Sequence, residues 1–587
     1  MVALLPYRSR VWSIDRGCFR QATATGTVYH HFGPLASRLV APVKRQGARN
    51  GRSGAKAGCR QRPSTRRHRP CPAATPGRRH EKAVFLIIRQ HYQRLSVNIA
   101  KDLEADCFNG IFPFVGTWGN DAVGEVLAVG LQGLHREILL FAAVGLAIGG
   151  LDDLLIDLLF LCRTSWRRLV IYARHPRMTT AALPASATPG RIAIFVPAWR
   201  EADVIAPMLR NALHCWRGSD YSLFVGVYPN DPDTIAAIAP VAEGESRIVV
   251  GVNPRPGPST KADCLNILWQ AMLNQEARDG IRFKAIVLHD AEDVVHPDEI
   301  RLFDYLIDRF ELVQLPVLPL PGRGGWLARA IADHYCDEFA ESHGKGLTVR
   351  EALGASIPSA GVACAFDRSM LGRLSDPVHG GPFDPSSLTE DYEAGLRISN
   401  MGGRGIFVRM RDAHGALVAT REYFPDTIDA AVRQKARWMI GISLAGWDRM
   451  GWHGGVAEWW MRIRDRRATM AALVLFAAYL ALILWGVIQL LRLYLPLAPP
   501  SPTPLLQGLL WLNLALMIWR TGMRALFVAR AYGWRHGIGA IPRTIIANYI
   551  AILAARRAVF LYGKSLLGKP LAWDKTQHRF PDLKTDP

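Results

Sequence analysis

Short apolar runs alternate with amphipathic stretches through the middle of the chain. Four runs rich in Val, Ile and Phe are typical of buried strands, and they lie at 191–198, 221–229, 246–253 and 283–290. Helical patterns at 201–216 and 261–277 separate several of them. Alternating strands and helices predict a parallel α/β sheet, which binds ligands outside the carboxyl ends of its strands. We therefore expect one soluble α/β domain over residues 188–440.

A longer apolar run precedes this block. Residues 137–161 are long enough to span a bilayer as a transmembrane helix. Asp152, Asp153 and Asp157 lie near its end. They either face protein or water inside the membrane, where such acids often have a role, or lie at the level of the interface. The basic cluster after residue 162 predicts that the following segment is cytoplasmic.

Apolar runs return in residues 441–587, which we interpret as a membrane region. Residues 468–491 and 505–529 predict two further spans, with a Pro-rich loop between them. Residues 544–563 contain two adjacent arginines, which would be costly at the bilayer centre. We favour an interfacial helix there over a fourth transmembrane span, which keeps the C-terminal tail cytoplasmic.

Composition changes this picture mainly at the N-terminus. The 587 residues are 49% hydrophobic and carry a formal net charge of +21. Residues 1–80 hold 17 Lys and Arg but a single acid, Asp15. The segment has no apolar period and no signal-peptide core. We expect residues 1–120 to be a basic, largely disordered extension, genuine or upstream of the true start, rather than an arm for nucleic acid or anionic lipid.

The nine cysteines are scattered, without a C-x-x-C pair. This spacing favours neither a disulfide framework nor a zinc site. We interpret the cysteines of the central block as small buried side chains in a reducing compartment.

A tight acid cluster follows the fourth apolar run. Asp290, Glu292 and Asp293 directly succeed the strand pattern, and residues two apart point the same way. Hard divalent cations prefer oxygen ligands, so Mg²⁺ or Mn²⁺ with a substrate diphosphate would balance these charges. The alternative is a solvated acidic turn.

Further candidate site residues lie at the ends of predicted elements of the block. They follow predicted strands, begin predicted helices or precede the second apolar region. In order they are Pro197, Glu201, Asn230, Asp231, Asp233, Lys261, Gly361, Glu390, Asp391, Gln434, Arg437 and Trp438.

This ordered set resembles the processive type of glycosyltransferase family 2, which includes cellulose and hyaluronan synthases. The resemblance covers about residues 188–440, through a D-x-D-like acid cluster, "TED" and "QKARW". The segments "GLDDLLID", "DAEDVVHP" and "PLAWDKTQHRFP" look like the bacterial inner-membrane glycosyltransferases of the phage adsorption protein B type, over about residues 120–587. The resemblance implies a GT-A, Rossmann-like α/β domain embedded between transmembrane helices of a multi-pass membrane protein.

The resemblance also implies a donor side to the site. Asp231 would contact the nucleoside and Lys261 the phosphates. Glu292, with Asp290 or Asp293, would hold the metal that carries the charge of the leaving diphosphate. The donor-binding set implied is Pro197, Glu201, Asn230, Asp231, Asp233, Lys261, Asp290, Gln434 and Arg437.

The acceptor side is implied in the same way. Asp391 would be the general base that takes the acceptor hydroxyl proton, and Glu390 would help to shape the site. Trp438 would stack on an acceptor sugar, with an interfacial anchor as its alternative. Gly361 would permit close backbone approach near the acceptor, or serve packing alone.

The expected function is an inverting, metal-dependent transfer from a nucleotide-sugar, by resemblance a UDP-sugar, to a cell-surface or secreted glycan. One base and one metal suffice for this step, and no second carboxylate is evident for a covalent route. Expected partners are a glycan or lipid-linked acceptor, membrane lipids and an outer-membrane secretion partner, with no nucleic acid. The expected location is the bacterial inner membrane, with a cytoplasmic catalytic domain. The alternatives are a non-enzymatic envelope scaffold used by phage and a nucleic-acid-binding protein; processivity stays open.

Overall fold

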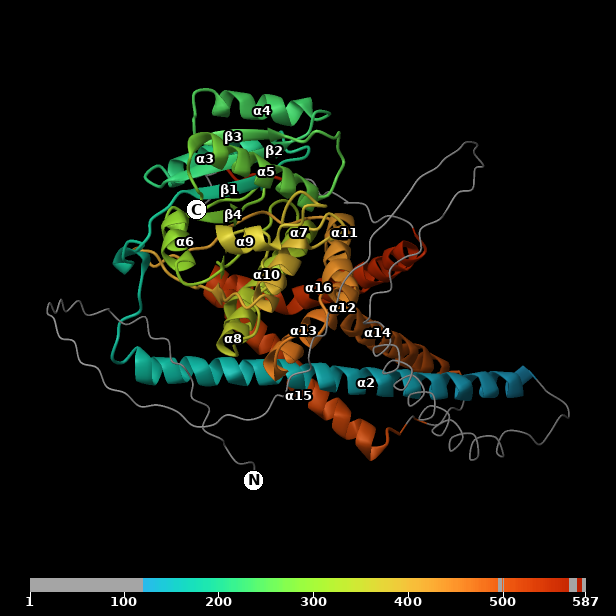
Figure 1. Cartoon of the computed structure of the whole chain (residues 1–587). Coiled ribbons are helices and arrows are strands. Elements are labelled where there is room, and N and C mark those ends of the chain that lie inside the picture. Colours follow the sequence, from blue (N-terminus) through green and yellow to red (C-terminus); the bar gives the residue numbers. More distant parts are fainter. Residues whose placement is uncertain (1–119, 495–498, 500, 569–577, 583–587) are drawn as a thin grey trace, which may run out of the picture. The chain divides into compact units, whose positions relative to one another are not determined.

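The computed structural model describes residues 120–494, 499, 501–568 and 578–582 of the chain. Nearly all of the predicted basic extension and part of the C-terminal tail lie outside these described residues. Figure 1 shows the described helices and strands along the chain.

A seven-stranded sheet forms the centre of the soluble block, in the order β3-β2-β1-β4-β6-β5-β7. The strands are β1 (Ile192–Pro197), β2 (Tyr221–Val227), β3 (Ile248–Val252), β4 (Ala285–Leu288), β5 (Leu312–Gln314), β6 (Cys364–Asp367) and β7 (Gly405–Phe407). The first four coincide with the predicted runs and pair in parallel. β5 and β7 also pair in parallel, but β6 runs antiparallel to β4 and β5. The sheet is therefore mixed, and the expectation of a parallel sheet was wrong for β6. The direction of so short a strand depends on its partners, which the local pattern does not reveal.

The soluble block also contains a series of helices. They are α3 (Ile205–Cys215), α4 (Pro232–Ala242), α5 (Lys261–Asp279), α6 (Glu299–Ile307), α7 (Trp326–Glu341), α8 (Leu347–Ala352), α9 (Arg368–Leu374), α10 (Glu390–Asn400) and α11 (Ile428–Trp438), with short turns η3 (Thr180–Ala182) and η4 (Ser342–Gly346). Side chains of β1 alternate between two cores. Ile194 packs toward α3 and α6, whereas Phe195 packs toward α5 and α10. This double burial explains the continuous apolar strands.

Helices also precede and follow the soluble block in the sequence. The block is preceded by α2 (Asn120–Trp166) and the short η2 (Arg167–Ile171). It is followed by η5 (Met439–Ala445), α12 (Gly446–Arg449), α13 (Val456–Arg466), α14 (Ala468–Leu491), α15 (Pro504–Tyr532) and α16 (Trp534–Leu566). α2 packs against α14 and α15. A Cβ added at Gly145 would lie 2.6 Å from Val474, and one added at Gly150 would lie 2.9 Å from Leu516. Glycine is needed at these positions for the helices to approach so closely.

Three of the described helices are long and apolar enough to cross a membrane: α2, α14 and α16. The chain is thus a membrane protein. α2 contains the predicted span 137–161, and α14 has the bounds of the second. α15 is not among the three, and the span predicted at 505–529 stays a prediction. α16 contains residues 544–563, so its composition allows the crossing that we had placed second to an interfacial helix.

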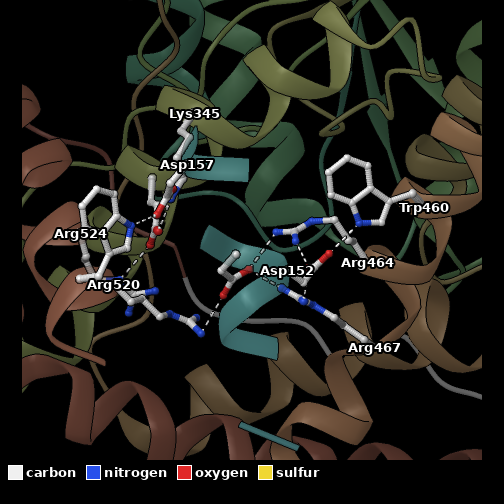
Figure 2. A network of polar contacts seen from close by, with 11 residues as sticks. Asp152, Asp157, Lys345, Trp460, Arg464, Arg467, Arg520 and Arg524 are labelled. Atoms are coloured by element: carbon white, nitrogen blue, oxygen red, sulfur yellow. Dashed lines mark hydrogen bonds and ion pairs between the residues drawn. The ribbon is translucent and has the colours of Figure 1, made fainter. Parts of the chain in front are cut away.

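The three aspartates of α2 face protein groups. Asp152 accepts a hydrogen bond from the Trp460 indole N–H at 2.6 Å, and Asp153 lies 2.6 Å from Arg467 and 2.9 Å from Arg520. Figure 2 shows this network, in which Asp152 also contacts Arg464.

Asp157 extends the network into the soluble block. It accepts a hydrogen bond from the Trp519 indole at 2.9 Å and pairs with Lys345 of η4. Lys345 also contacts Glu341 at 2.8 Å, and Glu341 contacts Arg524 of α15 at 3.0 Å. We name the four acids and their cations the junction cluster. Its members are Asp152, Asp153, Asp157, Glu341, Lys345, Arg464, Arg467, Arg520 and Arg524.

Candidate active site

The carboxyl ends of β1, β2 and β4 meet at one edge of the sheet. β1 pairs in parallel with β2 on one side and with β4 on the other. The loops after Pro197, Val227 and Leu288 therefore leave from neighbouring points. Because the chain connections diverge here, this edge is where an open α/β sheet binds its ligand.

The loop after β2 is joined to the loop after β1. The Asp231 carboxylate accepts a hydrogen bond from the Arg200 backbone N–H at 2.5 Å. The Asn230 side-chain amide donates to the Gly257 carbonyl and accepts from the Gly257 N–H, at 2.7 Å each. Asp233 is exposed in the first turn of α4. These contacts join the loops after β1, β2 and β3 into one rim, and the predicted donor-binding roles of its residues stay predictions.

The acid cluster contains a buried support. His289, Asp293 and Glu299 have no measurable exposure, with His289 Nδ1 2.7 Å from Asp293 and Nε2 3.2 Å from Glu299. Burial opposes a charge on His289, but Glu299 and Asp293 outweigh it and raise the pKa of His289 to about 10. Asp293 Oδ2 also accepts the Asp290 backbone N–H at 3.1 Å. Asp293 thus holds the loop from behind, which disfavours its predicted role as a metal ligand.

Glu292 points to a different set of partners. Ligand atoms of Glu201, Glu292 and His578 all lie within 4.8 Å of one another. His578 Nδ1 is 3.0 Å from Glu201 and 3.3 Å from Glu292. Burial raises the pKa of Glu292, and His578 acts in the opposite direction. Two carboxylates and one imidazole form a donor set for a divalent cation.

Lys261 joins the acid cluster to the T-E-D segment. Its Nζ lies 2.5 Å from Asp290 Oδ1. Burial opposes the charge on Lys261, but Asp290, Glu390 and Asp391 outweigh burial and hold its pKa above the usual value. Burial also raises the pKa of Glu390 and Asp391, while Lys261 lowers both. The sheet edge therefore brings together groups that lie far apart in the sequence.

Gly361 stands directly against Asp391. It has φ +76°, and a Cβ added there would lie 2.1 Å from Asp391 Oδ2. Only glycine tolerates both the conformation and the contact. Asp391 Oδ1 accepts its neighbour's N–H, that of Tyr392, at 2.8 Å. The predicted close approach of backbone at Gly361 is thus an approach to Asp391.

The Q-x-x-R-W residues lie on α11 with different surroundings. Burial and Asp391 raise the pKa of Glu390 to about 7, and the charge of Arg437 acts in the opposite direction. Gln434 is partly buried on the same helix. Trp438 packs with Phe339 and Phe424, with ring centroids 6.5 Å apart in each case. Stacking of Trp438 on an acceptor stays a prediction, and its aromatic neighbours favour a packing role.

Sequence reasoning missed several groups at this edge. His578 lies in the tail segment quoted above, yet nothing local shows that it returns to the sheet. Glu422 occupies a loop without a motif, and burial together with Asp293, Glu292 and Asp290 raises its pKa well above the usual value. The local sequence around either residue carries no signal that brings it to the sheet edge.

Comparison with known proteins adds the family. Residues 285–529 match the family model described as "Glycosyl transferase family group 2". This matched range is a family 2 glycosyltransferase domain. The matched range runs from β4 into α15 and includes the acid cluster, the T-E-D segment and α11. The mixed sheet is accordingly GT-A-like.

Two curated relatives share much of this chain. Bacteriophage adsorption protein B of Escherichia coli (strain K12) is 38% identical over 490 residues, which cover 79% of this chain and 64% of that protein. Bacteriophage N4 adsorption protein B of Escherichia coli O157:H7 has the same values. The chain thus matches somewhat less than two thirds of the length of these relatives.

Solved structures with a related fold are more distant. A mannosyltransferase, PcManGT from Pyrobaculum calidifontis, in complex with GDP-Man and Mn²⁺, is 15% identical, with a TM-score of 0.39 over 72% of this chain and 99% of that one. Glucosyl-3-phosphoglycerate synthase from Mycobacterium tuberculosis, in complex with Mn²⁺, UDP and its product, is 17% identical, with a TM-score of 0.30 over 48% of this chain and 88% of that one. These likenesses are too low to inform the site.

Proposed function

We propose that this chain is an inverting glycosyltransferase of the bacterial inner membrane. It transfers a sugar from a nucleotide-sugar, expected to be a UDP-sugar, to a growing cell-surface or secreted glycan. The observation that supports this best is the convergence at Lys261. This partly buried cation pairs with Asp290, and the charges of Glu390 and Asp391 also stabilise it. These acids come from two separate motifs of the family 2 domain.

The donor side follows from the rim and the acids. Asp231 and Asn230 order the loops around the nucleoside, and Lys261 and Arg437 face the diphosphate. Glu292, Glu201 and His578 suit Mg²⁺ or Mn²⁺, because carboxylate oxygens are the ligands that these ions prefer. A cation bound there would neutralise the diphosphate as it leaves.

Asp391 acts as the base in this proposal. Burial raises the pKa of its carboxyl, which favours proton uptake, while the charge of Lys261 opposes that rise. The carboxylate removes the acceptor hydroxyl proton as the hydroxyl oxygen attacks the anomeric carbon. Glu390 shapes the site beside it, with Arg437 nearby.

The apolar helices would hold the catalytic domain at the membrane. Catalysis on the cytoplasmic side would give access to nucleotide-sugars, and the acceptor would be a glycan or a lipid-linked glycan. The product would then pass to an outer-membrane secretion partner, and no nucleic acid takes part.

The direct test uses the purified chain in detergent with Mn²⁺ or Mg²⁺ and a panel of UDP-sugars. We expect UDP release with at least one donor, dependent on metal. Asp391→Asn should abolish it, while Asp279→Asn, an exposed aspartate at the end of α5, should not. No release with any donor, or full activity of Asp391→Asn, would count against the proposal.

A second candidate function rests on the names of the relatives, which describe phage adsorption. In that case the chain is a scaffold or receptor component of the envelope. Complementation of a deletion strain by an Asp391→Asn/Glu292→Gln double mutant would favour the scaffold. Loss of complementation by a stably produced double mutant would favour the enzyme.

A further inference from the structure

A buried glutamine lies behind the loop that faces Asp391. Gln314 is the last residue of β5 and has no measurable exposure. Its Nε2 lies 2.8, 3.0 and 3.2 Å from the carbonyl oxygens of Leu315, Val362 and Ala363. Its Oε1 accepts the Ala360 backbone N–H at 2.8 Å. One side chain thus satisfies both ends of the segment 360–363.

This segment adopts a backbone that needs support. Gly361 has φ +76° and Ala363 has φ +48°, and Ala363 is fully buried. A residue with a Cβ rarely adopts a positive φ, and such conformations persist only where surrounding contacts determine them. The hydrogen bonds from Gln314 reach the residues on both sides of Gly361. They therefore supply the contacts that the conformation requires.

The same segment is pressed against α10 at two points. A Cβ at Gly361 would lie 2.1 Å from Asp391 Oδ2 in the first turn. One turn later, a Cβ at Gly395 would lie 2.7 Å from the Ser359 backbone nitrogen. The Gly361 N–H also donates to the Ser359 hydroxyl at 3.1 Å. The backbone from 359 to 361 thus runs along α10 and limits where the Asp391 carboxylate can lie.

We propose that Gln314 is a positioning residue for Asp391. It holds segment 360–363 in its positive-φ form, and this form sets the position of Asp391 Oδ2 relative to the acceptor hydroxyl. The proposal rests on the proposed function, in which Asp391 is the base. Glutamine suits the task because the segment presents both carbonyl oxygens and an N–H. Glutamate would offer only acceptors to those carbonyls, and leucine would offer neither.

The kinetic test compares Gln314→Leu and Gln314→Glu with the wild-type chain in detergent, with the UDP-sugar that supports UDP release. We expect kcat to fall about 10- to 100-fold, since a base displaced by about 1 Å loses its alignment. KM for the donor should change less than about threefold, because the loops after β1 and β2 are untouched. The acid limb of the pH–kcat profile should move to lower pH, as water reaches Asp391.

The matched control is Gln275→Leu, another buried glutamine, which lies on α5. It should lower thermal stability without this split between kcat and KM. Retention of kcat within about twofold in both Gln314 variants would overturn the proposal. The same split in Gln275→Leu would overturn it too, because it would show a general packing effect.

A readout independent of activity separates this proposal from the proposed function. Hydrogen–deuterium exchange should increase in peptides that cover 357–364 and 388–396 in both Gln314 variants, with β1 and β2 unchanged. If the wild-type chain releases no UDP from any donor, the proposed function fails and the exchange result alone decides whether Gln314 orders the Asp391 contact. Unchanged exchange in those peptides would overturn the positioning role in either case.

Discussion

Two clusters of charged residues in this protein differ in how fully their acids are paired with cations. In the junction cluster each of the four acids has a cation within hydrogen-bond distance. Burial would raise the pKa of Glu341, yet Arg524 and Lys345 outweigh burial and lower it to about 2. At the sheet edge burial raises the pKa of Glu292, Glu390 and Asp391, and nearby cations only partly offset it.

This difference in pairing distinguishes a cluster with a structural role from a cluster with a proposed functional role. A buried acid with matched cations is satisfied within the protein and needs no ligand. A group of buried acids with raised pKa values is balanced only when something binds, and perturbed pKa values in a cleft mark functional sites. The junction cluster therefore joins the sheet block to α2 and α15, whereas the edge cluster is the part to which the proposed function assigns a cation and a diphosphate. Four experiments test this contrast, from the largest expected effect to the smallest.

Asp391→Asn should have the largest effect, on activity alone. Loss of a general base typically costs on the order of 10²- to 10⁴-fold in kcat. Thermal stability in detergent should stay equal or rise slightly, because one of several mutually repelling carboxylates is removed. A large fall in melting temperature would show that the edge cluster is structural after all.

Lys345→Met should have the opposite profile. The change removes the Lys345 partner of the buried Asp157, while Glu341 keeps Arg524, and we expect a loss of about 3 kcal/mol or more in unfolding free energy. UDP release per folded molecule should be nearly unchanged. The double variant Lys345→Met/Asp157→Asn should recover part of the stability, measured by chemical denaturation in detergent. An activity loss without a stability loss would contradict the assignment.

His289 predicts a pH dependence of stability. Its folded pKa of about 10 lies above the unfolded value of 6.5, so its contribution is fully present below pH 6.5 and is lost as the pH rises through 10. Melting temperature in detergent should therefore fall between pH 7 and pH 10. In His289→Gln that fall should be shallower, with lower stability at neutral pH. An equal slope in both proteins would remove His289 as the cause.

His578→Ala should have the smallest effect, on metal affinity. Removal of one of three ligand groups should weaken Mn²⁺ binding by on the order of tenfold or more, measured by paramagnetic resonance of free Mn²⁺. Arg579→Ala is the neighbouring control, since Arg579 contacts Asp426 at 3.7 Å with a mostly exposed side chain. Equal Mn²⁺ affinity in wild type and His578→Ala would exclude the tail from the metal site.

Most of the central fold could be predicted because its signals are local. The apolar runs at β1 to β4 and the helix patterns at α3 and α5 appear in continuous sequence, and the structure has all of them. The antiparallel direction of β6 could not be predicted, since it depends on pairing with β4 and β5. Likewise, the cations that pair with Asp152, Asp153 and Asp157 lie more than 150 residues away.

The sequence by itself determined the α/β block, its strand-end acids, the apolar helices and the resemblance to family 2 glycosyltransferases. These features depend on the spacing of residues close together in the sequence, because that spacing determines how each element buries its apolar face. Only the tertiary structure decided which acids are satisfied and which are not. It placed Asp293 behind the loop with His289, brought His578 to Glu201 and Glu292, and set Gln314 behind Gly361. The pairing of charges and the support of a strained backbone both depend on contacts between residues that are distant in sequence. Such contacts exist only once the chain is folded.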